Sequence, residues 1–115
     1  MALAVTKNDE WYDGKRYWVS LSITASGSYS SGGDTLNIAS LVKTGKVPIK
    51  GFAQIEGQAG FQYCFVPGTD NTAHKVKVFQ TGAAVSSPFA ELGAGAYPAG
   101  VTGDTIVGTF CFPLR

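Results

Sequence analysis

The sequence predicts an all-β protein, an antiparallel sandwich or barrel with very little helix. Apolar and polar residues alternate with a period of two in several segments, which is the pattern of half-buried strands. Clusters rich in glycine, proline and serine separate these segments and supply turns. Short strands spaced by such turns are typical of antiparallel sandwiches. A chain of 115 residues fits one domain, so residues 1–115 are expected to form a single β domain.

The clearest alternation runs from residue 17 to residue 26. One face carries Tyr17, Val19, Leu21, Ile23 and Ala25, and the other is mostly serine and threonine. Longer strands are also predicted at residues 61–66, 75–79 and 105–112, and shorter ones at 2–6, 35–38 and 49–55. Their apolar faces give the predicted core: Val19, Leu21, Ile23, Phe61, Tyr63, Phe65, Val76, Val78, Ile106 and Phe110.

Helix signals are weak. Residues 39–44 and 88–92 could each form about one turn, the second with Ser87 as its cap, and neither is long enough for an independent helix.

Composition excludes several classes of protein. The net charge of +1 lacks the basic excess that phosphate binding needs, so a nucleic-acid partner is not expected. No apolar run approaches the roughly 20 residues of a membrane span. The apolar stretch at the beginning of the chain is too short for the core of a signal peptide and has no basic residue before it, which predicts folding in a cytosol. We expect Cys64 and Cys111 to be two buried thiols, with a disulfide between them left open.

The chain offers no catalytic constellation. The single histidine, His74, begins a lysine-bearing strand and is interpreted as exposed. Asp34, Asp70 and Asp104 lie in turns, where aspartate bonds its own backbone. Asp34 and Asp104 share a setting, because Gly-Asp-Thr precedes a strand at both places. We interpret this as one turn used twice, and we expect no enzyme activity, no cofactor and no metal.

The N-terminal segment is the most polar part of the chain, and aromatic residues stand among its charged ones. Residues 1–16 are interpreted as an exposed arm or hairpin that docks on a partner. Aromatic and basic residues are interleaved there as they are at protein interfaces. The candidate contact residues, for a partner or for self-association, are Trp11, Tyr12, Lys15, Arg16 and Trp18. The alternative is structural, with Trp18 covering one sheet face and Trp11 folded back on the core.

Two stretches resemble a known group. Residues 1–10, with the strand that follows to Ser28-Tyr29, and residues 94–105 are similar to small virion proteins of tailed bacteriophages. The resemblance covers about the first 40 and last 25 residues, and the segment 42–84 has no counterpart. These proteins are small and β-rich, often jelly-roll-like, and several are capsid decoration, or cement, proteins. The resemblance therefore implies a jelly-roll-like sandwich for this chain. The group carries no shared catalytic residues.

The resemblance implies a structural role. Such a protein binds the outer surface of the capsid across subunits of the major capsid protein, in particles assembled in the host cytoplasm. Binding only the mature lattice stabilises that lattice by mass action. Self-association as a dimer or trimer is expected, since sandwich edges and capsid symmetry both favour it. The alternative is a carbohydrate- or receptor-binding module of a head or tail fibre, with Trp11, Tyr12, Tyr29 and Tyr97 stacking on sugar rings.

Overall fold

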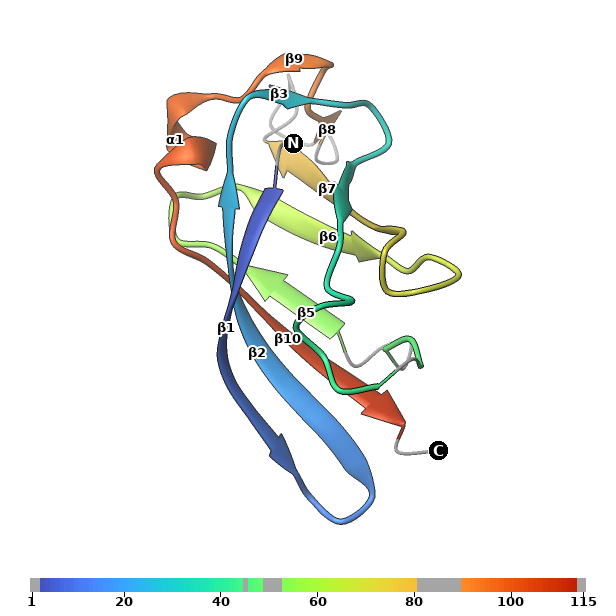
Figure 1. Ribbon diagram of the computed structural model, residues 1–115. Coiled ribbons are helices and arrows are strands. Elements are labelled where there is room, and N and C mark those ends of the chain that lie inside the picture. Colours follow the sequence, from blue (N-terminus) through green and yellow to red (C-terminus); the bar gives the residue numbers. More distant parts are fainter. Residues whose placement is uncertain (1–2, 45, 49–52, 81–89, 114–115) are drawn as a thin grey trace.

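The protein is an antiparallel β-sandwich in the computed structural model, which describes residues 3–44, 46–48, 53–80 and 90–113 (Figure 1). One sheet has the order β1-β2-β10-β5: β1 (Leu3–Tyr12), β2 (Arg16–Ala25), β10 (Ile106–Pro113) and β5 (Ala53–Glu56). The other has the order β4-β7-β6: β4 (Asp34–Leu36), β7 (His74–Gln80) and β6 (Gln62–Val66), with β8 (Ala90–Glu91) also paired to β7. The all-β prediction is confirmed, and the jelly-roll arrangement stays a prediction.

The β1–β2 hairpin is the longest feature of the fold and extends beyond the other strands at the bottom of Figure 1. The alternation in β2 directs Tyr17, Val19 and Leu21 inward, where each is almost completely buried. β1 is an edge strand and follows β2 in antiparallel register, with a bulge between Lys7 and Asp9. The bulge changes the register, so Lys7 pairs with Leu21 while Glu10 pairs with Val19.

The core lies between the inner faces of the two sheets. The ring of Phe110 on β10 meets Phe65 on β6 edge to face, with centroids 5.2 Å apart. The predicted core residues are buried, except that Phe61 and Phe65 are only half-buried. The prediction was wrong for these two because Phe65 lies on the edge strand β6, while Phe61 precedes that strand and covers Gly100.

Away from the hairpin tip, three tyrosines close the sandwich through carboxylates. The hydroxyl of Tyr29 donates to Glu91 at 2.5 Å, that of Tyr63 donates to Asp104 at 2.7 Å, and that of Tyr97 donates to Asp34. Each carboxylate also accepts a backbone N–H, from Gly32, Gln58 and Ser30 respectively. We call these three pairs the tyrosine end. β3 (Ser28–Tyr29) pairs with β9 (Gly95–Ala96) beside it.

Helix is confined to one short element among the described residues, α1 (Ala99–Thr102). The helical turn predicted over 88–92 is wrong where the structure describes it, because Ala90 and Glu91 form β8 against β7; residues 81–89 lie outside the described residues. Residues 39–41 form a turn, with Leu41 N–H bonded to Ile38. In the described part of the chain, no helix has the length and apolar character to cross a membrane.

Candidate functional site

The candidate site is the far half of the β1–β2 hairpin, residues 10–18, called here the hairpin end. Its turn is built on Asp13, whose carboxylate accepts the backbone N–H groups of Lys15 and Arg16 at 3.1 and 2.8 Å. Gly14 has a φ of 91°, a conformation that glycine adopts without strain. The Asp-Gly pair therefore closes the hairpin and fixes the direction of the aromatic residues on either side.

The outer face of the hairpin end carries two tryptophans. Trp11 and Trp18 are opposite each other in the register, and their rings are parallel within 1° with centroids 6.1 Å apart. The Trp18 indole N–H donates to Asp13 at 2.9 Å, and this bond, more than the turn N–H groups, holds the pKa of Asp13 below its usual range. Trp11 remains 41% exposed, so the pair presents an aromatic surface to solvent.

The inner face carries two tyrosines. Tyr12 and Tyr17 have ring centroids 5.0 Å apart, and Tyr17 continues to Phe112 in the core at 5.6 Å. Tyr12 is 56% exposed whereas Tyr17 is buried, so the aromatic row leads from solvent into the core.

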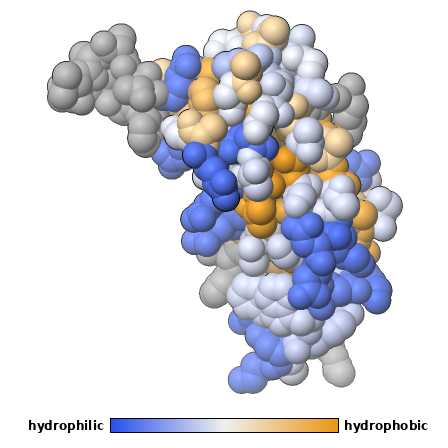
Figure 2. Space-filling view, turned by 90° about the vertical axis from the view of Figure 1, so that its left-hand side faces the viewer, coloured by the Kyte–Doolittle hydropathy of each residue, from blue (hydrophilic) through white to orange (hydrophobic). Residues whose placement is uncertain are grey.

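Figure 2 shows one face of the molecule, on which hydrophobic residues gather above the middle while the lower part is mostly white and blue.

Glu10 connects the hairpin end to the rest of the sandwich. It accepts the Tyr17 hydroxyl at 2.6 Å and pairs with Lys43 at 2.9 Å and Lys7 at 3.2 Å. The hydrogen bond from Lys43, followed by that from Tyr17, lowers the pKa of Glu10 to about 2. The same bond raises the pKa of Lys43. Burial, with the bond to Glu10, raises the pKa of Tyr17 to about 12.

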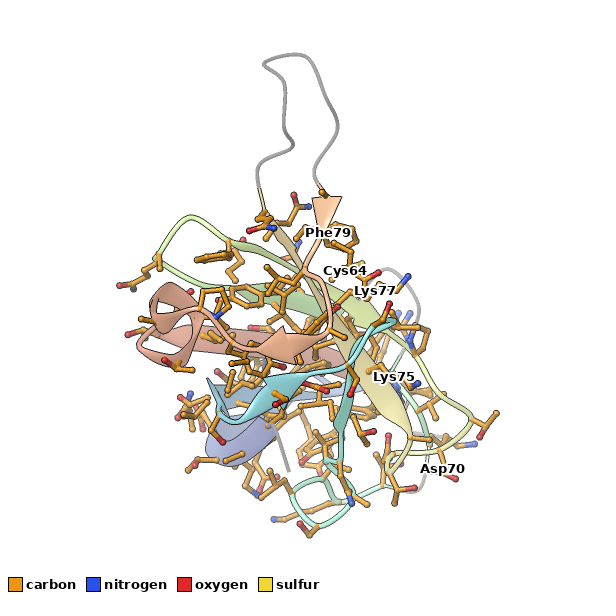
Figure 3. All side chains as sticks on the ribbon, turned by 90° about the horizontal axis from the view of Figure 1, so that it is seen from above. Cys64, Asp70, Lys75, Lys77 and Phe79 are labelled. Atoms are coloured by element: carbon orange, nitrogen blue, oxygen red, sulfur yellow. The ribbon has the colours of Figure 1, made fainter. Side chains whose placement is uncertain are left out.

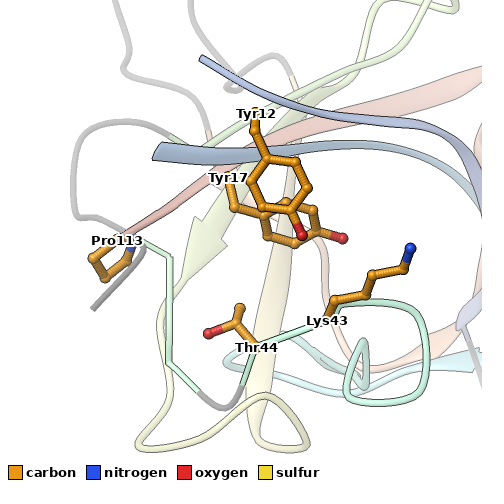
Figure 4. Close-up of a pocket in the computed structure, with 5 residues that line it drawn as sticks. All are labelled: Tyr12, Tyr17, Lys43, Thr44 and Pro113. Carbon is orange, nitrogen blue, oxygen red and sulfur yellow. The ribbon is translucent and has the colours of Figure 1, made fainter. Parts of the chain in front are cut away.

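A pocket of about 220 Å³ lies beside the Tyr12–Tyr17 pair (Figure 4). Its lining comes from both strands of the hairpin, from the end of β10 and from the segment that follows β4: Tyr12, Tyr17, Lys43, Thr44 and Pro113. The pocket combines aromatic and proline surface with an ammonium and a hydroxyl group. Such a mixture suits a single side chain of another protein, with an apolar stem and a polar end.

The segment bearing Lys43 and Thr44 is held in place by Asn71. The Asn71 amide donates to the carbonyls of Lys46 at 2.9 Å and Thr44 at 3.3 Å, and its backbone carbonyl accepts the N–H of Ile38. Asn71 in turn bonds His74 at 2.9 Å. The prediction of an exposed His74 was wrong: the ring is fully buried, because the 67–73 loop folds over it and Phe65 lies against it at 5.0 Å.

The five residues proposed from the sequence share the hairpin end, but on two faces. Trp11 and Trp18 lie on the outer face and Tyr12 on the inner one, with Lys15 and Arg16 at the turn. Trp11 stacks on Trp18 instead of folding back on the core. Sequence reasoning missed Glu10, Tyr17, Lys43, Thr44 and Pro113. The alternation marked Tyr17 only as core, and no local signal connects Lys43 to Glu10.

The two cysteines differ in environment, and both are free. Cys111 lies on β10 opposite Trp18 of β2 and is buried, and burial raises the pKa of its thiol. The prediction of burial was wrong for Cys64, which lies on the outward face of β6 opposite Lys77 (Figure 3). Side chains alternate along β6, and because Tyr63 points into the core, Cys64 next to it points away from the core. The described residues contain no cluster of histidine, cysteine or acidic side chains able to hold a metal ion.

The sugar-stacking platform suggested by four tyrosine and tryptophan residues is not assembled. Tyr29 and Tyr97 were expected at the surface, but both are buried, and their rings meet at 5.6 Å within the tyrosine end. Only Trp11 and Tyr12 of the proposed four are exposed, and they face opposite sides of the hairpin.

Comparison of the chain with protein-family models, with curated proteins and with solved structures found no match.

Proposed function

We propose that this protein decorates and stabilises a tailed-phage capsid, and that its hairpin end binds across subunits of the major capsid protein. The observation that carries the proposal is the exposure of Trp11 and Tyr12 at the tip of the longest hairpin, while most other large apolar side chains of the described residues are buried. Exposed aromatic side chains on a projecting element are typical contact residues of protein interfaces.

The basic side chains of the hairpin end, Lys15 and Arg16, suit an acidic contact surface. Its two acidic side chains are engaged within the protein, Glu10 with Lys7 and Lys43 and Asp13 with the turn N–H groups and Trp18. Both ion pairs found among the described residues involve Glu10, and neither includes Lys15 or Arg16. Lys15 lies in the turn and Arg16 begins β2 directly after it. A partner that presents carboxylates to the turn and an apolar hollow to Trp11 would match both features.

Binding to many equivalent sites would stabilise the lattice even where each contact is weak. The virion location, assembly in the host cytoplasm and self-association as a dimer or trimer belong to the same proposal. They rest on the phage resemblance in residues 1–40 and 94–105 and on the lack of a basic excess that would suit nucleic acid.

A double variant tests the contact. Trp11→Ala with Tyr12→Ala should weaken co-sedimentation with purified capsids by at least about tenfold, since two aromatic contacts are removed. Val107→Ala is the matched control, because Val107 is also exposed, at 37%, but lies away from the hairpin end. Capsid binding equal to that of the unaltered chain, with circular dichroism unchanged, would exclude the hairpin end as the contact.

Copy number tests the role itself. Quantitative mass spectrometry of purified particles should give a ratio to the major capsid protein near one or a simple fraction of it. A few copies per particle would instead indicate a tail or fibre component, and absence from particles would overturn the proposal.

A further inference from the structure

The buried imidazole of His74 has its two nitrogens in different roles. The backbone N–H of Gly68 points to Nδ1 at 2.8 Å, so Nδ1 must accept and carries no hydrogen. Nε2 lies 2.9 Å from the Asn71 oxygen Oδ1 and donates its hydrogen there. The ring is therefore neutral, in the tautomer with hydrogen on Nε2, and both nitrogens are satisfied.

From His74 the hydrogen bonds continue to the wall of the pocket. Asn71 uses its amide nitrogen for the carbonyls of Thr44 and Lys46, and its backbone carbonyl for Ile38. Residues 38–44 are called here the Lys43 segment. Lys43 and Thr44 line the pocket at the hairpin end, and Lys43 pairs with Glu10. Asn71 is 4% exposed, so water offers little substitute for the bonds it makes.

A second proton on the ring is incompatible with this arrangement. Protonated Nδ1 would point a hydrogen at the Gly68 N–H, and rotating the ring does not help because both nitrogens then donate. Gly68 is also packed so closely on the backbone of Ala73 and His74 that a side chain at this position would clash. The 67–73 loop must shift, and Asn71 shifts with it.

The charged groups around His74 do little to stabilise a positive ring. Asp70 in the 67–73 loop favours the charged form, but its carboxylate accepts from the N–H and hydroxyl of Thr72. On β4, Asp34 accepts from Tyr97, and on β8, Glu91 accepts from Tyr29. β6 contributes no charged residue, and the lysines of β7, Lys75 and Lys77, alternate with the inward-facing His74 and Val76. Burial, opposed by Asp70, lowers the pKa of His74.

We propose that His74 is a pH-operated latch for the Lys43 segment: the neutral ring holds Asn71 against Thr44 and Lys46, and protonation releases that side of the pocket. The latch is a property of the chain alone. Its use in regulating attachment rests on the proposed function, and predicts that capsid binding weakens as the pH falls through the midpoint of the His74 ring.

Nuclear magnetic resonance of the isolated chain tests the latch directly. His74 is the single histidine, so its ring signals are unambiguous. We expect Nε2–H at neutral pH, a ring midpoint below about 6.5, and amide signals of Ile38, Thr44 and Lys46 that move with that same midpoint. A ring that titrates while those amides stay still would overturn the latch.

Two variants and a control separate the links. His74→Gln can accept from Gly68 and donate to Asn71 without titrating, so the Lys43 segment should become insensitive over about pH 8 to 5. Asn71→Ser keeps the histidine but disconnects it, so the ring should titrate while Thr44 and Lys46 no longer follow; this serves also if His74→Gln does not fold. Asn37→Ser is the control, because Asn37 is exposed and its side chain accepts the N–H of nearby Ala39. A Lys43 segment that still titrates in Asn71→Ser would contradict the proposed connection.

Capsid binding at about pH 7.5 and at a pH about one unit below the ring midpoint measured by nuclear magnetic resonance then separates the two proposals. The unaltered chain should lose at least about tenfold in affinity at the lower pH and His74→Gln should not. If the Lys43 segment follows His74 but the chain binds no capsid at either pH, the latch stands and the proposed function fails. If capsids bind equally at both pH values, the regulatory use of the latch is overturned.

Discussion

The hairpin end and the tyrosine end use the same chemistry to opposite effect. In both, a tyrosine hydroxyl donates to a carboxylate. At the tyrosine end each carboxylate has a backbone N–H as its other partner, and the rings of Tyr29 and Tyr97 are buried. At the hairpin end Glu10 has two lysines as further partners, and the aromatic row continues outward to an exposed Tyr12.

This difference shows what decides whether an aromatic residue builds the core or presents a contact surface. The residues of the tyrosine end come from β3, β4, β6, β8 and the segments beside α1, so backbone N–H groups lie close enough to complete each carboxylate. The hairpin end projects past the other strands (Figure 1). Glu10 therefore pairs with lysine side chains, and the rings of Trp11 and Tyr12 are exposed to solvent. Residue type alone is the same in both places, and position in the topology makes the distinction.

The largest contrast is expected when one ring is removed at each end. Tyr97→Ala should lower the free energy of unfolding by about 3–5 kcal/mol, because a buried ring and the partner of Asp34 are both lost. Tyr12→Ala should cost less than about 1 kcal/mol, because the ring is mostly exposed. Urea unfolding of both variants measures this, and equal losses would remove the distinction between the ends.

Removing a hydroxyl alone sharpens the comparison. In Tyr29→Phe the carboxylate of Glu91 and the buried N–H of Val78 both lose a partner, so we expect a loss of about 1–3 kcal/mol. Tyr17→Phe should cost less than about 1 kcal/mol. Glu10 keeps Lys43 and Lys7, and the backbone N–H of Lys43 that also bonds the Tyr17 hydroxyl belongs to an exposed residue, where water can replace the lost partner. A larger loss for Tyr17→Phe in urea unfolding would reverse the assignment of the buried and exposed networks.

Both ends should lose stability at the extremes of pH. Hydrogen bonds from Tyr29 and Gly32 lower the pKa of Glu91, and Lys43 and Tyr17 lower that of Glu10 to about 2. The contribution of these two carboxylates to the free energy of unfolding is present above about pH 4.3 and is lost as the pH falls through their lowered pKa values.

At alkaline pH the tyrosines matter. Burial, and then the bonds to the carboxylates, raises the pKa of Tyr17 and Tyr29 to about 12. That contribution is complete below about pH 10 and disappears as pH rises toward 12. The urea midpoint measured across pH should therefore fall on both sides, and Tyr29→Phe should flatten the alkaline fall.

The smallest effect concerns the thiols. Cys64 is exposed and Cys111 buried, so a thiol reagent should label one site in the native protein and two after unfolding. Cys64→Ser should change the free energy of unfolding by less than about 0.5 kcal/mol and abolish native labelling. Rapid native labelling of Cys111 would mean that the Trp18 side of β10 opens readily.

The sequence predicted what depends on neighbours along the chain. The alternation in β2 placed Val19 and Leu21 inside, and the aromatic and basic residues near the turn were located correctly at one hairpin. Contacts between residues that are far apart in the sequence could not be predicted from it. His74 is buried because the 67–73 loop and the Lys43 segment converge on it, although its neighbours in sequence are those of an exposed strand.

The repeated Gly-Asp-Thr turn was recognised only in part. Local bonding explains Asp34 accepting the N–H of Ser30, as turn aspartates do. It does not disclose that Asp34 and Asp104 each accept a tyrosine hydroxyl from a distant part of the chain. The local sequence predicts where each carboxylate lies, but the tyrosine that bonds it is brought there by the fold of the whole chain.

The bulge in β1 affects whether copies of the chain can associate edge to edge. A straight ten-residue edge strand would be a template for edge-to-edge polymerisation. Here the extra residue interrupts the ladder between Lys7 and Asp9, and Lys7 turns a charge toward the inner side of the edge. Another copy could not extend the sheet past this point without burying that ammonium. The β1 edge is therefore protected against the open-ended addition of strands from other copies of the chain.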